Sequence, residues 1–163
     1  MNENVELLNY IHEDSLMGIS SLTTMIRKLN DKDNKIKKLI ESELKDYEHY
    51  KKESEKMLKK YKGEVLEASI MAKTMAKMKL NFDIMKDNSD SKIADILTRG
   101  FTMGTIDMNK KIDEYKKSAD KNVLKLAKEF LEFQNKNIEL LKEYSLFLFI
   151  YSITIIIVGE VIK

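Results

Sequence analysis

The two histidines of this chain lie among carboxylates at spacings that resemble part of a metal site. Asp46 and His49 are three residues apart, which places the two side chains on one side of a helix. A helical hairpin that turns near Asn30 and Asp31 is expected to set His12 opposite about His49. Imidazoles and carboxylates are the ligands of di-iron sites in helical bundles. The spacing therefore indicates one half of such a centre.

The second half of a di-iron centre is missing from the sequence. Such a centre takes a Glu from each of two helices and a Glu-x-x-His from each of the other two, all pointing inward. The helix that should supply the second Glu-x-x-His offers only the run from Glu132 to Asn135, which has no histidine. Glu129 and Glu132 are expected on the polar face of that helix, together with Lys125 and Lys136. The set of ligands is thus incomplete.

His12 and Glu43 are also interpreted more simply, as buried polar residues in apolar stripes. We expect His12 to be satisfied by a hydroxyl or a carboxylate across the hairpin. Glu43 needs a partner, such as a tyrosine hydroxyl or a lysine, or a raised pKa. Asp46 and His49 are rotated to the flank of their helix. The candidate metal ligands are therefore His12, Glu43, Asp46 and His49, with iron as the candidate metal, but we expect no bound metal or cofactor and no catalytic residue.

Composition and motifs exclude several other functions. The chain contains no cysteine, so it has no thiolate ligand or nucleophile. We find no glycine-rich phosphate loop, nucleophile elbow or calcium loop, and no small-molecule substrate is identifiable. The 29 basic and 27 acidic residues are interleaved, which argues against a nucleic-acid surface. The densest basic stretch, Lys51 to Lys62, is expected to be a solvated helix face, with contact to anionic lipid as the alternative.

Apolar spacing and helix-breaking residues predict an all-α fold of five long helices. Lys62-Gly63 is expected to end the second helix with a C′ glycine, and Gly100 and Gly104 leave room for a neighbouring backbone. The five helices run from about Asn4 to Leu29, from beyond Asp33 to about Tyr61, from Glu64 to about Lys86, from Ser91 to about Lys117, and from Lys121 into an apolar tail.

The third predicted helix differs from the others because its apolar stripe is narrow and rich in methionine, which suits packing on a preformed surface. If it is an outer crossover helix, the second and fourth helices are parallel. The fold is then a ferritin-like four-helix bundle with a helical crossover. A plain five-helix up-and-down bundle is the alternative.

Four stretches of the sequence resemble an uncharacterised ferritin-like helical-bundle family of clostridia and related Firmicutes. The likeness covers roughly Asn4 to Tyr144 and implies the bundle fold, but it implies no activity, and the apolar tail is not part of the pattern. The stretches are YIHEDSLMGI from Tyr10, the second-helix run with Tyr47 and the end Lys60 to Gly63, SKIADILTRGFTMG from Ser91, and VLKLAKEFLEFQNKNIELLKEY from Val123.

The final residues of the sequence differ sharply from the rest. Ser145 to Ile162 carries a single charge, Glu160. About 20 largely apolar residues span a membrane, so this segment is at the short edge of that length. We therefore divide the chain into a bundle at 1–144 and an apolar tail at 145–163. Leu146 to Ile162 is expected to anchor the chain in a membrane, with burial in a homo-oligomer or an unstructured tail as alternatives.

These observations lead to one principal hypothesis of function. The acidic beginning of the sequence lacks a secretory signal, so we expect a cytoplasmic body attached to the cytoplasmic membrane. The absence of a complete catalytic motif favours a non-enzymatic structural or interaction module. The alternatives are a divergent ferritin-like metal-binding protein that handles iron or oxidants, and a soluble homo-oligomer with apolar C-terminal contacts.

Overall fold

Four α-helices pack together in the computed structural model, which describes residues 2–30, 32–65 and 87–161, with side chains as far as Ser145. These residues contain no strand, and the prediction of an all-α bundle is confirmed. The predicted third helix lies outside the described residues from position 66 onward, and its first two residues, Glu64 and Val65, are not helical. The four helices are α1 (Glu3–Lys28), α2 (Lys37–Lys60), α4 (Asp90–Tyr115) and α5 (Lys121–Val161).

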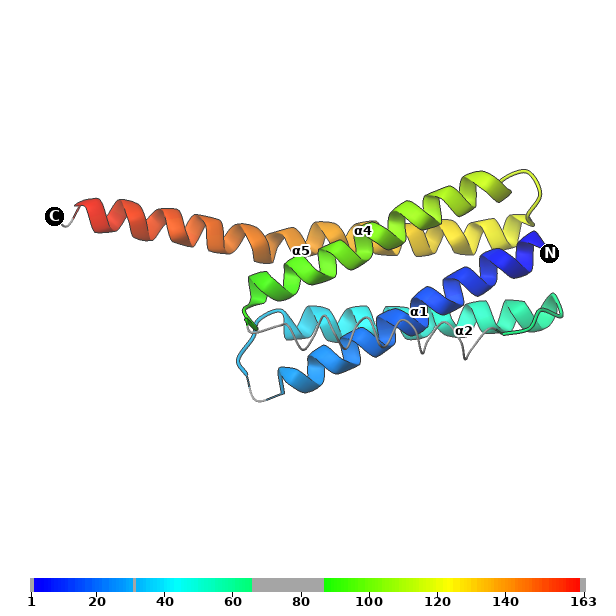
Figure 1. Ribbon diagram of the computed structural model, residues 1–163, viewed down its shortest axis with the longest axis horizontal. Helices are drawn as coiled ribbons and strands as arrows, with labels where there is room; N and C mark the ends of the chain where they lie inside the picture. Colours follow the sequence, from blue (N-terminus) through cyan, green and yellow to red (C-terminus); the bar gives the residue numbers. More distant parts are fainter. Residues whose placement is uncertain (1, 31, 66–86, 162–163) are drawn as a thin grey trace.

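The helices form two antiparallel hairpins that pack against each other (Figure 1). One hairpin consists of α1 and α2, and the other of α4 and α5. The hydroxyl of Tyr61, after α2, donates to Asp120 before α5 at 2.6 Å. At the opposite end, Asn34 before α2 donates to Asp90 at the start of α4, also at 2.6 Å. These bonds show that α2 runs parallel to α4 and antiparallel to α5.

Local sequence signals set the ends of three helices. The side chain of Asn2 accepts a hydrogen bond from the N–H of Asn4 and caps α1, and the hydroxyl of Ser89 accepts from Lys92 and caps α4. Such caps satisfy donors that have no partner within the helix. Two acidic residues in the first turn of α1 and two basic residues in its last turn complement the helix dipole. By contrast, α2 begins after Ile36 without a side-chain cap.

The register of the first hairpin differs from the predicted one. Because α1 ends at Lys28 and α2 begins at Lys37, the centre of the turn lies later than the expected position at Asn30. This shift moves α2 relative to α1 by more than one helical turn. His12 consequently lies beside Glu55, and the expectation that it lies opposite His49 is wrong.

The core is built from apolar side chains of all four helices, with an aromatic cluster at its centre. The ring of Tyr47 on α2 stacks on Phe101 of α4 at a centroid distance of 5.8 Å. It meets Phe133 of α5 edge-on at 5.0 Å, and Phe130 completes the cluster. Edge-to-face and offset stacked pairs stabilise a core beyond the area they bury. This cluster joins the two hairpins.

Helix α5 is longer than the bundle. Leu141 is fully buried and Tyr144 packs, partly buried, against the core. Beyond Tyr144 the helix continues to Val161 and extends past the ends of the other helices (Figure 1). At a rise of 1.5 Å per residue the extension is about 25 Å long. The same helix therefore contributes to the core and leaves the bundle.

Candidate functional site

A polar contact crosses the interior of the bundle between the two hairpins. Gln134 of α5 is fully buried, and its side-chain nitrogen donates a hydrogen bond to Asp14 Oδ2 of α1 at 2.6 Å. Gly104 of α4 makes room for this pair, because a Cβ there would collide with the amide of Gln134 and lie 3.2 Å from Asp14 Oδ2. The space at Gly104 is thus filled by a side chain, whereas the sequence led us to expect a neighbouring backbone.

Tyr47 of α2 belongs to the same interior layer. A Cβ on Gly18 of α1 would lie 2.5 Å from the Tyr47 ring, so this glycine allows the ring to lie against α1. Burial raises the pKa of Tyr47 well above its usual value, the charges of Asp14 and Glu43 raise it further, and a hydrogen bond with Gln134 lowers it in part. Tyr47 is therefore neutral throughout the physiological pH range.

The pKa of Asp14 is raised to about 6. Burial is the largest cause, the hydrogen bond from Gln134 opposes it, and the charge of Asp107 adds to it. Asp107 itself is exposed on α4. At neutral pH Asp14 is mostly a carboxylate, which is the form that best accepts the bond from Gln134.

Glu43 of α2 is fully buried, as its position in the apolar stripe predicted. Among the described residues, neither of its carboxylate oxygens has a hydrogen-bond partner. Burial raises its pKa to about 8, and the charge of Asp46 adds to the effect. The sequence predicted either a partner for Glu43 or a raised pKa, and the raised pKa is the outcome in the structure. Glu43 is therefore mainly protonated at neutral pH.

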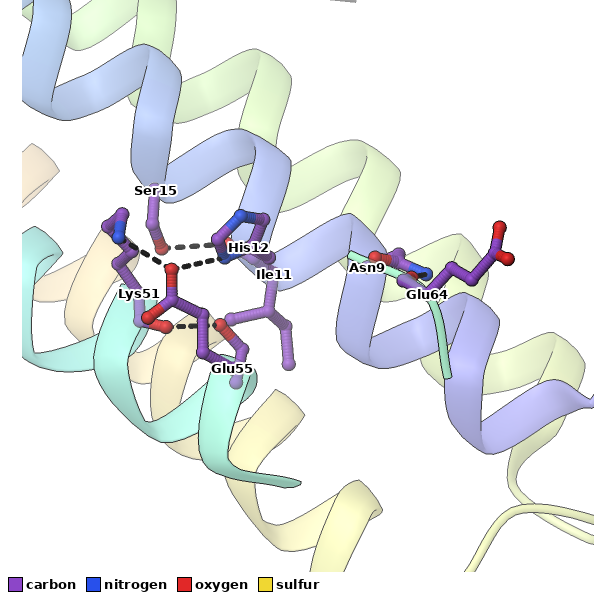
Figure 2. A network of polar contacts seen from close by, with 8 residues as sticks. Asn9, Ile11, His12, Ser15, Lys51, Glu55 and Glu64 are labelled. Atoms are coloured by element: carbon purple, nitrogen blue, oxygen red, sulfur yellow. Dashed lines mark hydrogen bonds and ion pairs between the residues drawn. The ribbon is translucent and has the colours of Figure 1, made fainter. Parts of the chain in front are cut away.

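His12 lies in a second polar group, between α1 and α2 (Figure 2). The imidazole is fully buried, and its Nδ1 is 3.9 Å from Glu55 Oε1, within ion-pair range when the ring is protonated. Glu55 Oε1 also accepts a hydrogen bond from Lys51 Nζ at 2.6 Å. The hydroxyl of Ser15, on α1 like His12, donates to the Ile11 carbonyl at 2.7 Å. The prediction that the imidazole is buried is confirmed. The Glu55 carboxylate across the hairpin lies at ion-pair distance, longer than the hydrogen bond that the sequence led us to expect.

The four candidate metal ligands do not come together. Asp46 and His49 are exposed on the flank of α2, as predicted, while His12 and Glu43 are buried. His12 is level with Glu55, which is about 18 Å along α2 from Glu43. In the part of the chain that the structure describes, no three histidine or carboxylate side chains are grouped to hold a metal ion. These residues do not fit a di-iron centre.

Sequence reasoning missed the Asp14–Gln134 pair. A signal was present, because Gln134 is four residues after Phe130 and seven after Ala127, both buried on the inward face of α5. The polar side chain at an inward position could therefore have been recognised. Its partner could not, because Asp14 and Gln134 are far apart in sequence and the register between the hairpins was unknown.

Comparison with models of protein families, with curated proteins and with solved structures finds no match. The resemblance to the ferritin-like family therefore stays a prediction. Among the residues whose side chains the structure describes, no helix is long and apolar enough to cross a membrane. The apolar segment from Leu146 to Ile162 lies outside those residues, and its contact with lipid also stays a prediction.

Proposed function

We propose that this chain is a non-enzymatic structural or interaction module, held at the cytoplasmic face of a membrane by the apolar end of α5. The observation that carries the proposal is the continuity of α5. It is one helix from Lys121 to Val161, packed in the bundle up to Tyr144 and extended beyond it (Figure 1). The bundle therefore has no flexible connection to its apolar segment.

The sequence of this extension suits lipid better than water. Ser145 to Ile162 has one charged residue, and an apolar surface of this length needs cover in an aqueous setting. A helix is one of the few structures that satisfies its own backbone groups within a bilayer. Lys142 and Lys163 flank the segment at positions from which lysine side chains reach the membrane surface.

The charges that precede the segment support the proposed orientation. Lys136 and Lys142 lie within the last turns of α5 before Tyr144. Lysine and arginine near the end of a membrane span favour the cytoplasmic side. This preference supports a cytoplasmic location for the bundle.

The connectivity that we propose for the bundle is ferritin-like. Since α2 and α4 run parallel, the chain between them returns from one end of the bundle to the other. A long return of this kind distinguishes ferritin-like bundles from those with short loops only. The fold supplies a rigid body and does not by itself imply a reaction.

The non-enzymatic part of the proposal rests on the position of the polar groups. Glu43, His12 and Gln134 are fully buried, so a substrate in solution does not reach them without a change of conformation. The two exposed candidates, Asp46 and His49, lie on the outer flank of α2. We assign the interior groups a role in holding the helices in register.

Flotation with lipid vesicles tests the tether. The full chain and a version ending at Tyr144 are each made in the presence of vesicles and centrifuged through a density gradient. We expect the full chain to float and the shorter chain to stay at the bottom as a folded helical protein.

Two outcomes contradict the proposal. If neither version floats and the full chain is a defined oligomer that the shorter version does not form, the end of α5 is a subunit contact. If the shorter version, purified without chelator, carries stoichiometric iron that His12→Ala or His49→Ala removes, the metal-binding alternative is correct.

A further inference from the structure

The connection between α1 and α2 lies at the end of the bundle where α5 leaves. Asn34 in this connection donates hydrogen bonds to Asp90 at 2.6 Å and to the carbonyl of Asn88 at 3.0 Å. Burial raises the pKa of Tyr144 of α5, and the charge of Asp90 raises it further, so these two side chains lie at the same end of the bundle. Figure 1 shows the connection, the start of α4 and the exit of α5 together at this end. Segments far apart in sequence thus lie together on one side of the exit point.

This surface carries a concentration of positive charge. The stretch 27–38 contains six basic and two acidic residues. We call its basic side chains the exit collar. All but Lys37 are exposed, and Lys37 is half-buried, donating to the carbonyls of Asn30 and Lys32. The exit collar consists of Arg27, Lys28, Lys32, Lys35, Lys37 and Lys38.

Two carboxylates beside the start of α4, Asp87 and Asp90, accept hydrogen bonds at this surface. Asp90 accepts from the backbone N–H of Lys35 at 3.0 Å as well as from Asn34. Asp87 accepts from the backbone N–H of Ser89 at 2.8 Å, and this bond lowers its pKa. Both carboxylates hold the shape of the surface. Together with Asp31 and Asp33 of the stretch 27–38, they set four carboxylates against the six basic side chains of the collar, which remain in excess.

Other cations of this end are paired locally. Lys142 Nζ is 2.6 Å from Glu139 on the same helix, and Lys92 is 3.8 Å from Asp95. Exposed pairs of this kind contribute little to stability. The exit collar differs from these two lysines in number, because it groups six basic side chains within twelve residues.

The length of the apolar segment fixes how close this surface comes to lipid. The extension of α5 beyond Tyr144 is about 25 Å long, whereas the hydrocarbon core of a bilayer is about 30 Å thick. A helix this short must enter the bilayer at its first apolar residues. Because α5 is continuous through Tyr144, no slack separates the bundle from the membrane. The end of the bundle must then lie among the lipid headgroups.

We infer that the exit collar is a binding surface for the anionic headgroups of membrane lipids. This inference rests on the proposed function and specifies the membrane that the module prefers. Each lysine or arginine near an anionic surface strengthens binding by about fivefold. The collar therefore selects bilayers rich in anionic lipid, while the apolar segment supplies attachment to any bilayer.

A second basic stretch of the chain serves as an internal control. Lys51 to Lys62, the densest basic stretch identified in the sequence, ends at the opposite end of the bundle. Tyr61 is bonded there to Asp120, and the N-terminal residue Val5 packs beside Gly63. Its charge is like that of the collar, but it lies in the second half of α2, with Lys52 about 22 Å and Lys60 about 35 Å from the start of that helix beside the exit of α5.

Flotation of matched variants tests the inference. The collar variant combines Arg27→Gln, Lys32→Gln and Lys38→Gln, and the control variant combines Lys52→Gln, Lys59→Gln and Lys60→Gln. All six positions are exposed, and each variant loses three charges. The full chain, the collar variant and the control variant are each made with phosphatidylcholine vesicles and with vesicles that also contain phosphatidylserine.

We expect the full chain and the control variant to prefer the anionic vesicles, and the collar variant to lose that preference by on the order of 100-fold while still binding phosphatidylcholine. The preference of the full chain should also weaken as salt is added. If the collar variant keeps the preference for anionic vesicles, or the control variant loses as much of it, the inference that the collar binds anionic lipid is wrong. The proposal that the apolar segment attaches the chain to a membrane is not affected by either result. A full chain that floats with neither kind of vesicle overturns the tether and the collar together.

Discussion

The hydrogen bond between Asp14 and Gln134 connects α1 in one hairpin with α5 in the other. Apolar packing alone tolerates small shifts between helices, whereas a buried donor and acceptor must meet at a fixed position. Gly104 and Gly18 provide the space that this layer needs. We therefore regard the layer as the feature that fixes how the two hairpins dock.

Two glycines of α4 provide a direct test of this view. A Cβ at Gly100 would have open space around it, so Gly100→Ala should raise the free energy of unfolding by about 0.5 to 1 kcal/mol through helix propensity. At Gly104 the added methyl meets Gln134. Gly104→Ala should lower the free energy of unfolding by about 1 to 2 kcal/mol, because crowding outweighs propensity. Urea denaturation measures both, and an equal gain at the two positions contradicts the packing described here.

Glu43 should make stability depend on pH. Its pKa is about 8 in the folded chain and 4.5 as an ordinary value, so the folded state holds a proton that the unfolded state has released. The contribution of Glu43 to stability is then fully present below about pH 4.5 and falls by about 1.4 kcal/mol per pH unit until about pH 8. Glu43→Gln keeps the shape of the protonated side chain, and it should remove this fall and stabilise the chain at about pH 8.

The measurement is urea denaturation at about pH 6.5 and about pH 7.5, because both values lie above the pKa of Asp14 and below the pKa of Glu43. The titratable groups that interact with Glu43 include Asp46, Tyr47 and Tyr144, and they are unchanged in the variant. Glu41→Gln, on the exposed face of the same helix, is the matched control and should behave as the unsubstituted chain. A Glu43→Gln variant with the same pH dependence as that chain would show that Glu43 is ionised in the folded state.

Single-residue predictions from the sequence succeeded where they depended on one helix. The inward positions of His12 and Glu43 and the outward positions of Asp46 and His49 follow from helical periodicity, and they are confirmed. The partner of a buried residue depends on the register between helices. For that reason the sequence did not identify Glu55 beside His12 or Asp14 beside Gln134.

At the scale of helices, the end of α2 is the clearest departure from expectation. The N–H of Gly63 donates to the Leu58 carbonyl at 2.9 Å and that of Lys62 to the Lys59 carbonyl at 3.2 Å, which is the Schellman pattern. The left-handed residue of this motif is Lys62, with φ of 53°, and not the predicted Gly63. Gly63 is required for another reason, because a Cβ there would lie 2.8 Å from Val5.

This geometry predicts that Lys62→Gly stabilises the chain. A residue with a Cβ pays about 1 kcal/mol or more in the left-handed region, and glycine does not. We expect thermal or urea unfolding to show a gain of about 1 kcal/mol. Lys60→Gly, within the last turn of α2, should instead destabilise by about 1 kcal/mol, and a loss at both positions contradicts the assigned cap.

The bounds of the helices were predictable to within a few residues where a cap or a breaker was present. Ser89 caps α4, and the fourth helix was expected to begin at Ser91. The start of α2 was predicted less well, since it lacks a side-chain cap and the polar run before it has no single breaker. That error in the turn produced the wrong pairing of His12 with His49.

At the scale of the whole molecule, the continuity of α5 joins the bundle to its apolar segment without a hinge. Under the proposed function, a rigid connection would determine which end of the bundle faces the membrane, whereas a flexible linker would not. The change in composition after Tyr144 was visible in the sequence. The position of the exit collar beside it was not, because that depends on the stacking of the two hairpins.

The most direct test of this account measures which end of the bundle touches the membrane. The chain contains no cysteine, so Asp33→Cys near the exit collar and Ser118→Cys at the opposite end can each carry a single fluorophore. Both positions are exposed, and the length of α4 separates them by about 40 Å. The labelled full-length chains are bound to vesicles that contain a quencher attached to lipid headgroups. We predict strong quenching at position 33 and little at position 118, and equal quenching at the two positions, or none at either, would contradict the account.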